Sequence, residues 1–321
     1  MRVAVVGVGL IGGSIALAAR DRLDADVRES DPAIGGLSVE QALEGAEAAF
    51  VAAPLGVLGD VVDEVLAAAP ADCVVSDVGS VKAPLLRDDE RFCGGHPLAG
   101  SEQRGREHAR ADLFEGATWY LTPTSRTGGI LLERLHRIIA GLGARPRSIG
   151  ADEHDRMLAT VSHLPHVVAN VLVKDAVGAI GPSFRDATRV AGANPPLWRD
   201  IYLANRHELS RAIGAVRAEL AAVDRALLEG DGEWLEDWQA FAADRRRELL
   251  ESEGAGGALA EVRMVVPNRP GVVAELALAL GRAGINIHDM SLSPSADNTR
   301  GEIAFWVPEA EAARAAEVVG A

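Results

Sequence analysis

The chain opens on a short apolar strand pattern that runs directly into a glycine-rich turn, and this feature restricts the fold more than any other. Residues 2–6 read RVAVV, and the next six residues read GVGLIG, a G-x-G-x-x-G spacing. Helical spacing follows at once in IGGSIALAAR. A strand, this turn and a helix, in that order, open a dinucleotide-binding βαβ unit. The glycine spacing alone is a weak signal, but here it stands in the context that it requires.

The first 150 residues continue this alternation of strand and helix patterns. Further strand patterns stand at 24–32, 47–54 and 72–80, of which 47–54 is an apolar run, and helical spacing occurs between them, as in GDVVDEVLAAA at 59–69. Strands that alternate with helices form a parallel sheet covered on both faces. We therefore expect residues 1–150 to form a Rossmann-type α/β domain, to which 92–97 and 118–123 add further strands.

The rest of the chain divides into a helical part and a small α+β part. Between 151 and 250, apolar residues recur at three- and four-residue spacing, which predicts an all-α domain. Its long apolar helices exceed what one copy of so small a domain can bury, so we expect them to form a homodimer. Residues 251–257 (ESEGAGG) are typical of a flexible linker. Residues 258–321 read strand, turn, helix, strand, strand and helix.

Composition argues against several classes of function. The formal net charge of −15 disfavours nonspecific binding to nucleic acid, which requires Lys- and Arg-rich surfaces. No apolar run approaches the roughly 18 residues of a membrane span, and we expect no signal peptide before the first strand. Cys73 and Cys93 form neither a C-x-x-C pair nor a disulfide ladder, which favours a cytoplasmic setting and buried, inert thiols.

The glycine turn predicts where a dinucleotide binds. Gly7 allows the tight turn, Gly9 lets the pyrophosphate approach the backbone, and Gly12 lets the helix pack on the strand. The first amides of the helix then face the phosphates. The candidate cofactor-binding residues are Gly7, Gly9, Leu10, Ile11, Gly12, Asp31, Pro54 and Ser80.

The acidic residue after the second expected strand bears on the choice of cofactor. An acidic side chain about 20 positions beyond the glycines binds the ribose of NAD, and Asp31 follows Gly12 by 19 positions. Glu29 is a rival for this role, Arg28 lies nearby, and Asp31 can instead cap the loop before Pro32. No arginine stands in the next positions to receive a 2′-phosphate, which favours NAD over NADP.

Two polar residues end neighbouring strands on the rim where such folds bind ligands. Ser80 closes the fourth expected strand, and His96 ends the next one. Removal of a hydride from a hydroxyl-bearing carbon requires an acceptor for the hydroxyl proton, and a histidine, with a pKa of about 6.5, suits that role. The alternatives are an N-cap role for Ser80, before a helix at 82–87, and a structural His96. Five other histidines have no comparable setting: His108, His136, His154, His207 and His288.

The helical domain carries two further polar segments. Ser162 and His166 are four residues apart and share a face, and Pro165 bends the helix between them. A metal is the rival interpretation for the close histidines, but no cysteine or carboxylate completes a zinc set at the usual spacing, so we expect no metal. Arg185 and Arg189 offer guanidinium groups to a carboxylate substrate, the alternative for Arg189 being an ion pair with Asp186 or Asp200.

Seven segments in order resemble the prephenate dehydrogenase family over residues 1–250: GxGLIGGS, DVGSVK, GGHPLAGSE, DLFEGATWYLTP, SHLPH, FRDATR and LWRDIYLAN. The resemblance implies oxidative decarboxylation of prephenate to 4-hydroxyphenylpyruvate with reduction of NAD, in tyrosine biosynthesis. It implies that His96 is the base, that Ser80 orients it, and that Arg189 binds a substrate carboxylate. The substrate-binding residues that it implies are Arg189, His166, Ser162, Glu102, Ser101, Asp186 and Trp198.

Residues 258–321 resemble the ACT domain, a ferredoxin-like, amino-acid-sensing module. The PNRPG turn and the GIN at 284–286 carry this resemblance, although the last strand of the full module is missing from the pattern. It implies tyrosine, the end product of the pathway, as an effector.

Three other functions compete with this interpretation. An arogenate dehydrogenase performs the same chemistry on an amino-bearing substrate, and the sequence does not separate the two. A 3-hydroxyacid dehydrogenase would use a lysine of the helical domain, where Lys174 lies outside any motif. A non-catalytic NAD- or amino-acid-sensing protein is disfavoured by the set of His96, Ser80 and Arg189.

Overall fold

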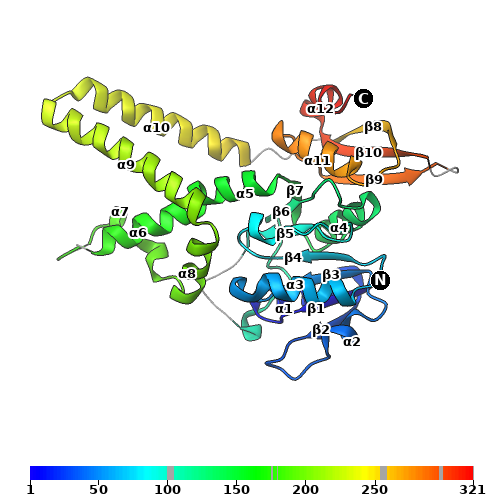
Figure 1. The fold of residues 1–321 in the computed structure, drawn as a ribbon. Helices are drawn as coiled ribbons and strands as arrows, with labels where there is room; N and C mark the ends of the chain where they lie inside the picture. Colours follow the sequence, from blue (N-terminus) through cyan, green and yellow to red (C-terminus); the bar gives the residue numbers. More distant parts are fainter. Residues whose placement is uncertain (100–104, 175, 179, 254–258, 296–298, 321) are drawn as a thin grey trace. The chain divides into compact units, whose positions relative to one another are not determined.

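The computed structural model describes residues 1–99, 105–174, 176–178, 180–253, 259–295 and 299–320, which form two compact units (Figure 1). The first unit comprises Met1–Met157, Gly192–Ala204 and Leu259–Ala321, and the second comprises Leu158–Ala191 and Asn205–Ala258. The first unit is therefore larger than the expected nucleotide-binding domain 1–150, because two short helical segments and the terminal module pack with it.

A four-stranded parallel sheet lies at the centre of the first unit, as the alternating pattern predicts. Its order is β2-β1-β3-β4, and its strands are β1 (Arg2–Val6), β2 (Asp26–Ser30), β3 (Ala48–Val51) and β4 (Val74–Asp77). Three helices connect them: α1 (Leu10–Leu23), α2 (Val39–Leu43) and α3 (Leu55–Ala68).

Alternate residues of β1 enter two different hydrophobic cores. Val3 and Val5 pack in the core that contains α1, whereas Ala4 and Val6 pack in the core that contains α2 and α3. Every residue of β3 and β4 is buried, since helices cover both faces of a parallel sheet. The Rossmann-type prediction is confirmed. Cys73 and Cys93 are buried free thiols, as expected, and burial raises the pKa of Cys73 to about 12.

A second, three-stranded sheet extends the first, and it departs from the all-parallel expectation. Its order is β5-β6-β7, formed by β5 (Gly94–Pro97), β6 (Thr118–Thr122) and β7 (Arg145–Ser148). The β5–β6 pairing is antiparallel and the β6–β7 pairing is parallel. A parallel bridge between Val75 and Phe92 joins this sheet to β4. Between β6 and β7 runs α4 (Gly129–Gly141), and short 3-10 turns lie at η1 (Ala83–Leu85) and η2 (Arg106–His108).

The terminal module packs on α4 and β7 of the same unit. Its sheet has the order β8-β10-β9, and its elements are β8 (Leu259–Pro267), α11 (Val272–Arg282), β9 (Asp289–Pro294), β10 (Arg300–Pro308), η5 (Glu309–Glu311) and α12 (Ala312–Val319). Val273 and Phe305 of the module share one hydrophobic core with Leu135 of α4. A Cβ on Gly281 would overlap the Ser148 carbonyl oxygen, so a glycine is required for this close approach. As expected, the described part of the module ends on a helix, with three strands in its sheet.

The helical region begins with a continuous run of three segments. These are α5 (Ala151–Leu158), a π-helical turn η3 (Ala159–His163) and α6 (Leu164–Lys174). The bend expected at Pro165 therefore takes the form of a π turn that ends just before it. Single π turns of this kind occur frequently at functional sites.

The later helices are α7 (Pro182–Thr188), the 3-10 turn η4 (Arg189–Gly192), α8 (Pro195–Ala204), α9 (Arg206–Glu229) and α10 (Gly232–Glu253). Because α10 continues to Glu253, it enters the expected linker 251–257. Large apolar side chains of the second unit are exposed, among them Val161 at 63%, Leu228 at 82% and Phe241 at 72%. In the described residues no helix has both the length and the apolar character that a bilayer crossing needs.

Candidate active site

The turn between β1 and α1 has the geometry of a phosphate cradle. Gly7 has a φ of 90°, and a Cβ on it would stand 2.7 Å from the Ala52 carbonyl oxygen. A Cβ on Gly12 would overlap the Gly7 carbonyl oxygen, whereas a Cβ on Gly9 would meet no described atom within 4 Å. The described residues place no side-chain cap and no acidic side chain in the first turn of α1. The helix amides can therefore receive an anion on the open side of Gly9, and the turn fits a dinucleotide.

Asp31 connects the end of β2 to this turn. Its Oδ2 accepts a hydrogen bond from Val8 N at 2.7 Å, and its Oδ1 accepts one from Ala33 N at 2.8 Å. The second bond caps the loop that follows β2, so the alternative role considered for Asp31 is present. A ribose contact remains a prediction, and Asp31 lies beside the glycine turn where that contact requires it.

The neighbours of Asp31 are held by other protein groups. The Glu29 carboxylate pairs with Arg20 at 2.7 Å and with Arg106 at 2.8 Å. Arg28 Nη1 donates to the Gln41 carbonyl oxygen at 3.1 Å. These contacts favour Asp31 over Glu29 as the ribose ligand.

The other cofactor candidates follow the carboxyl ends of the parallel strands. Leu10 and Ile11 open α1, Pro54 is the N-cap of α3, and Ser80 lies in the loop after β4. The N-cap role considered for Ser80 is wrong, because the helix expected at 82–87 is only the short 3-10 turn η1 and Lys82 precedes it.

His96 lies in β5, opposite Tyr120 of β6, and is 8% exposed. The two glycines before it are required by close packing. A Cβ on Gly95 would stand 2.7 Å from both the Asp77 carbonyl oxygen and Ser76 Oγ, and one on Gly94 would overlap Thr122 Oγ1. Gly95 thus lets β5 lie close to β4, and Gly94 lets it lie close to β6, which fixes the position of His96 in β5.

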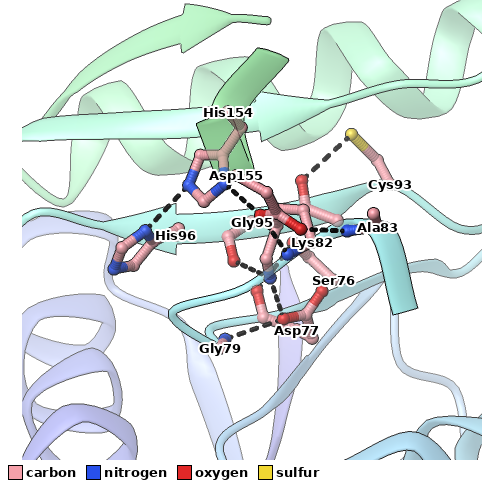
Figure 2. Close-up of polar contacts among 11 residues, drawn as sticks. Ser76, Asp77, Gly79, Lys82, Ala83, Cys93, Gly95, His96, His154 and Asp155 are labelled. Atoms are coloured by element: carbon pink, nitrogen blue, oxygen red, sulfur yellow. Dashed lines mark hydrogen bonds and ion pairs between the residues drawn. The ribbon is translucent and has the colours of Figure 1, made fainter. Parts of the chain in front are cut away.

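His96 is linked to a second histidine and then to a carboxylate (Figure 2). Its Nδ1 lies 2.9 Å from His154 Nε2, and His154 Nδ1 lies 2.8 Å from Asp155 Oδ1. Asp155 also accepts backbone hydrogen bonds from Lys82 N at 2.7 Å and Ala83 N at 2.9 Å. Burial lowers the pKa of His154, against the opposing effect of Asp155. The three residues form a continuous buried chain from the helix α5 to the strand end.

Beneath this chain lies a buried ion pair. The Lys82 ammonium contacts the Asp77 carboxylate and donates to the Gly95 carbonyl oxygen at 2.6 Å. Both side chains are fully buried. Burial lowers the pKa of Lys82, and the Asp77 carboxylate opposes this effect. Lys82 thus joins β4, β5 and, through its backbone amide, Asp155.

The second unit brings together His166 and Arg189. Burial lowers the pKa of His166, and the positive charge of Arg189 lowers it further. Ser162 lies one turn before His166, in the π-helical segment, and is partly exposed. Between them, the buried His163 has its Nδ1 3.1 Å from Asn205 Nδ2. Arg189 and His166 therefore share one local environment, and their roles toward a substrate remain predictions.

The remaining predicted substrate residues are divided between the units. Asp186 is exposed in α7 of the second unit, and its carbonyl oxygen accepts a hydrogen bond from Arg189 N. Trp198 lies in α8 of the first unit, with its ring centroid 5.5 Å from that of Tyr202. In the same helix the Asp200 carboxylate pairs with Arg199 at 2.7 Å. Ser101 and Glu102 lie outside the described residues. No group of three or more metal-ligating side chains occurs among the residues that are described.

Sequence reasoning placed His154 among the histidines without a comparable setting, and that judgement was wrong. His154 contacts His96 directly, and Asp155 completes the chain. A signal was present in the sequence, since a His-Asp pair lies within the helix that follows β7. Its meaning depended on α5 packing against β5, which the pattern of the helix does not specify.

Three known families match successive parts of this chain. Residues 33–147 match the family described as prephenate dehydrogenase, nucleotide-binding domain, and residues 150–241 match prephenate dehydrogenase, dimerization domain. Residues 260–321 match the ACT domain.

Among curated relatives, the chain is 29% identical to the prephenate dehydrogenase of Bacillus subtilis, over 92% of this chain and 89% of that protein. It is also 29% identical to the cyclohexadienyl dehydrogenase of Zymomonas mobilis, over 73% of this chain and 90% of that protein.

Two solved structures share the fold of the first two domains. One is prephenate dehydrogenase from A. aeolicus in complex with hydroxyphenyl propionate and NAD⁺, with a TM-score of 0.70 and 27% identity, over 78% of this chain and 98% of that one. The other is Synechocystis arogenate dehydrogenase, with a TM-score of 0.69 and 26% identity, over 77% of this chain and all of that one.

Proposed function

Because the chain belongs to the prephenate dehydrogenase family, we propose that it converts prephenate to 4-hydroxyphenylpyruvate, with loss of carbon dioxide and reduction of NAD, in tyrosine biosynthesis. The enzyme is an oxidoreductase with a Rossmann-type domain, a helical domain of the dimerisation family and an ACT domain. The observation that most supports the proposal is the position of His96 in β5, where it is nearly buried and its Nδ1 lies 2.9 Å from His154 Nε2.

In the proposed reaction, different residues of the chain bind the cofactor, accept the proton and bind the substrate. Bound NAD supplies the hydride acceptor. The glycine turn and the α1 amides hold its pyrophosphate, and Asp31 holds its ribose. His96 accepts the proton of the ring hydroxyl as that carbon loses its hydride, with Ser80 orienting it. Arg189 binds a substrate carboxylate beside His166. The carboxylate on the ring leaves as carbon dioxide because its loss makes the ring aromatic. No general acid is therefore needed for that step.

The test is an NADH absorbance assay of the purified protein with prephenate and NAD. Rapid NADH formation with release of carbon dioxide is the expected result. Absence of turnover with prephenate and with arogenate would overturn the proposal.

Arogenate is the alternative substrate, and the likeness to Synechocystis arogenate dehydrogenase favours testing it. The two substrates differ in the group on the side chain, keto or amino, and not in the ring that reacts. The ratio of kcat/KM for prephenate and arogenate decides between them, and we expect it to favour prephenate.

We propose NAD rather than NADP as the cofactor. The Asp31 carboxylate would repel a 2′-phosphate, and the nearby Arg28 is hydrogen-bonded to Gln41. Titration with each dinucleotide checks this, with the lower Kd expected for NAD.

We also propose a cytoplasmic location for the protein, because both cysteines are free thiols.

A homodimer through the helical domain accounts for the exposed apolar side chains of the second unit, such as Val171 at 63% and Leu227 at 62%. Exposed apolar surface of this extent is typical of an interface. Sedimentation of the purified chain is expected to give the mass of a dimer, and a monomer at micromolar concentration would contradict it.

Tyrosine is the proposed effector of the ACT domain. A cavity of about 330 Å³ lies between the 267–270 turn and α4, and its lining includes Asn268, Arg269, Arg134, Asp72 and Glu90. Charges of both signs suit the ammonium and carboxylate groups of an amino acid. We expect tyrosine to bind by calorimetry and Asn268→Ala to weaken that binding, with turnover in the absence of tyrosine unchanged.

A further inference from the structure

The series of hydrogen bonds that joins His96, His154 and Asp155 determines which nitrogen of each histidine carries a hydrogen. Asp155 accepts the Lys82 and Ala83 amides on its two oxygens, and such bonds favour an ionised carboxylate. A carboxylate can only accept hydrogen bonds, so the 2.8 Å contact requires His154 Nδ1 to donate.

The same reasoning passes along the chain to His96. A neutral histidine that donates through Nδ1 must accept through Nε2. The 2.9 Å contact then requires His96 Nδ1 to carry a hydrogen and donate it to His154 Nε2. His96 Nε2 is left as the basic nitrogen of the ring.

We infer that His154 and Asp155 are positioning residues for the reaction: they fix His96 in the tautomer whose Nε2 accepts the substrate proton, and they stabilise the charged ring that results. The inference rests on the proposed function, in which His96 is the base. When the hydroxyl O–H bond breaks, an Nε2–H bond forms on His96. The Nδ1 hydrogen of His96 stays in its bond to His154 Nε2 and Asp155 stays ionised, so the transferred proton ends on His96, and the Asp155 carboxylate stabilises that positive charge through His154.

The surroundings of His154 support this role. It is fully buried, and the ionisable groups that face it are Asp155 on its own helix, His96 on β5, Tyr120 on β6, and the Lys82–Asp77 pair beneath. Since Lys82 is paired with Asp77 and burial disfavours a charged His154, the neutral form of His154 assumed above is the one that these groups favour.

Two substitutions of His154 separate a positioning role from a structural one. The amide oxygen of His154→Gln can occupy the place of Nε2 and accept from His96 Nδ1, whereas His154→Phe keeps the bulk of the ring and offers no acceptor. We expect kcat to fall by about 10²-fold or more in His154→Phe, as for loss of the tautomer-setting group in a catalytic triad, and by much less in His154→Gln. KM should change little in either variant. His207→Phe, the same replacement at an exposed histidine of α9, serves as the control and should retain the kcat of the unchanged protein.

The pH profile and the tautomer provide readouts beyond the rate. Without His154 the charged form of His96 loses the Asp155 carboxylate behind it, so the acid limb of kcat/KM should move to lower pH in His154→Phe. Nitrogen NMR of histidine-labelled protein without substrate should show His96 with hydrogen on Nδ1, and this signal should be lost in His154→Phe. The His96 resonance is identified as the histidine signal that disappears in His96→Asn.

Three results would overturn the inference: a kcat in His154→Phe within about threefold of the unchanged protein, equal losses in the Gln and Phe variants with an unmoved pH profile, or an Nε2-protonated His96 in the unchanged protein. Failure of the proposed function is distinct, since it appears as no turnover by the unchanged protein, while the NMR measurement still tests the tautomer.

Discussion

At the scale of single residues, the site depends on a few side chains whose polar atoms are satisfied inside the protein. His96 is nearly buried, and its imidazole is held by His154 rather than by solvent. A base fixed in one orientation transfers a proton without first reorganising, which is how general bases contribute their part of the rate.

Replacement of the base provides the first prediction. In His96→Asn the side chain keeps a hydrogen-bonding group toward His154 but has no nitrogen of suitable basicity. We expect kcat to fall by about 10³-fold, within the range that general base catalysis contributes, with little change in KM. Steady-state kinetics with prephenate and NAD measure it, and near-normal turnover would show that another group is the base.

The buried ion pair provides a second prediction at this scale. Lys82→Met leaves the Asp77 carboxylate buried without its cation, and loss of one partner of such a pair costs about 3–5 kcal/mol. We expect a fall of that size in the free energy of urea unfolding. The double variant Lys82→Met/Asp77→Asn removes both charges and should recover part of the loss. If the single and double variants were equally stable, the pair would have no such role.

At the scale of elements, two glycines of the turn between β1 and α1 have different roles, one in packing and one in ligand binding. Gly12 has no room for a Cβ because α1 lies against the turn, whereas Gly9 has open space on the side where a pyrophosphate would lie. We therefore expect Gly12→Ala to lower both the Tm and the affinity for NAD. Gly9→Ala should leave the Tm unchanged and weaken NAD on the order of tenfold or more, because its methyl group takes the place of the ligand. Thermal unfolding and NAD titration of both variants check this, and a normal Kd in Gly9→Ala would place the cofactor elsewhere.

Elements also differ in how much of them the sequence could predict. The strands β1, β3 and β4 are short apolar runs buried on both faces, and their patterns predicted them. By contrast, β7 (RPRS) has no apolar run, and it is a strand because β6 pairs with it. Local patterns likewise could not distinguish a proline bend from the π turn η3, since the extra residue in that turn is accommodated by packing around it.

At the scale of the whole molecule, the terminal module is joined to the nucleotide-binding domain by a buried histidine. His136 of α4 has its Nε2 3.2 Å from the Ile287 carbonyl oxygen of the module. Burial, the dominant cause, lowers the pKa of His136 to about 4. The module is thus packed against an element of the catalytic domain through a group that must stay neutral.

This contact predicts a loss of stability in acid. A histidine whose pKa is lowered from 6.5 to about 4 in the folded protein contributes stability above pH 6.5 and loses it as pH falls toward 4. The full effect is roughly 3 kcal/mol. His136→Gln cannot be protonated, so its Tm should fall less between pH 7 and pH 5 than that of the unchanged protein. Since His154 is present in both proteins, its own titration cancels in the comparison. Parallel Tm curves would contradict the assignment.

The sequence by itself determined the Rossmann-type domain, the helical domain, the terminal module and the identity of His96, Ser80 and Arg189 as site candidates. The domains, and the places of His96 and Ser80 near strand ends, follow from local spacing, because a turn, a strand end or a helix face is specified by neighbouring residues. The choice of Arg189, and the roles of all three residues, came from the resemblance of segments such as FRDATR to the family. Only the tertiary structure decided that His154 and Asp155 stand behind His96, that Lys82 is buried against Asp77, and that the terminal module shares a core with α4. Each of these joins residues distant in the sequence, and such contacts depend on how whole elements pack.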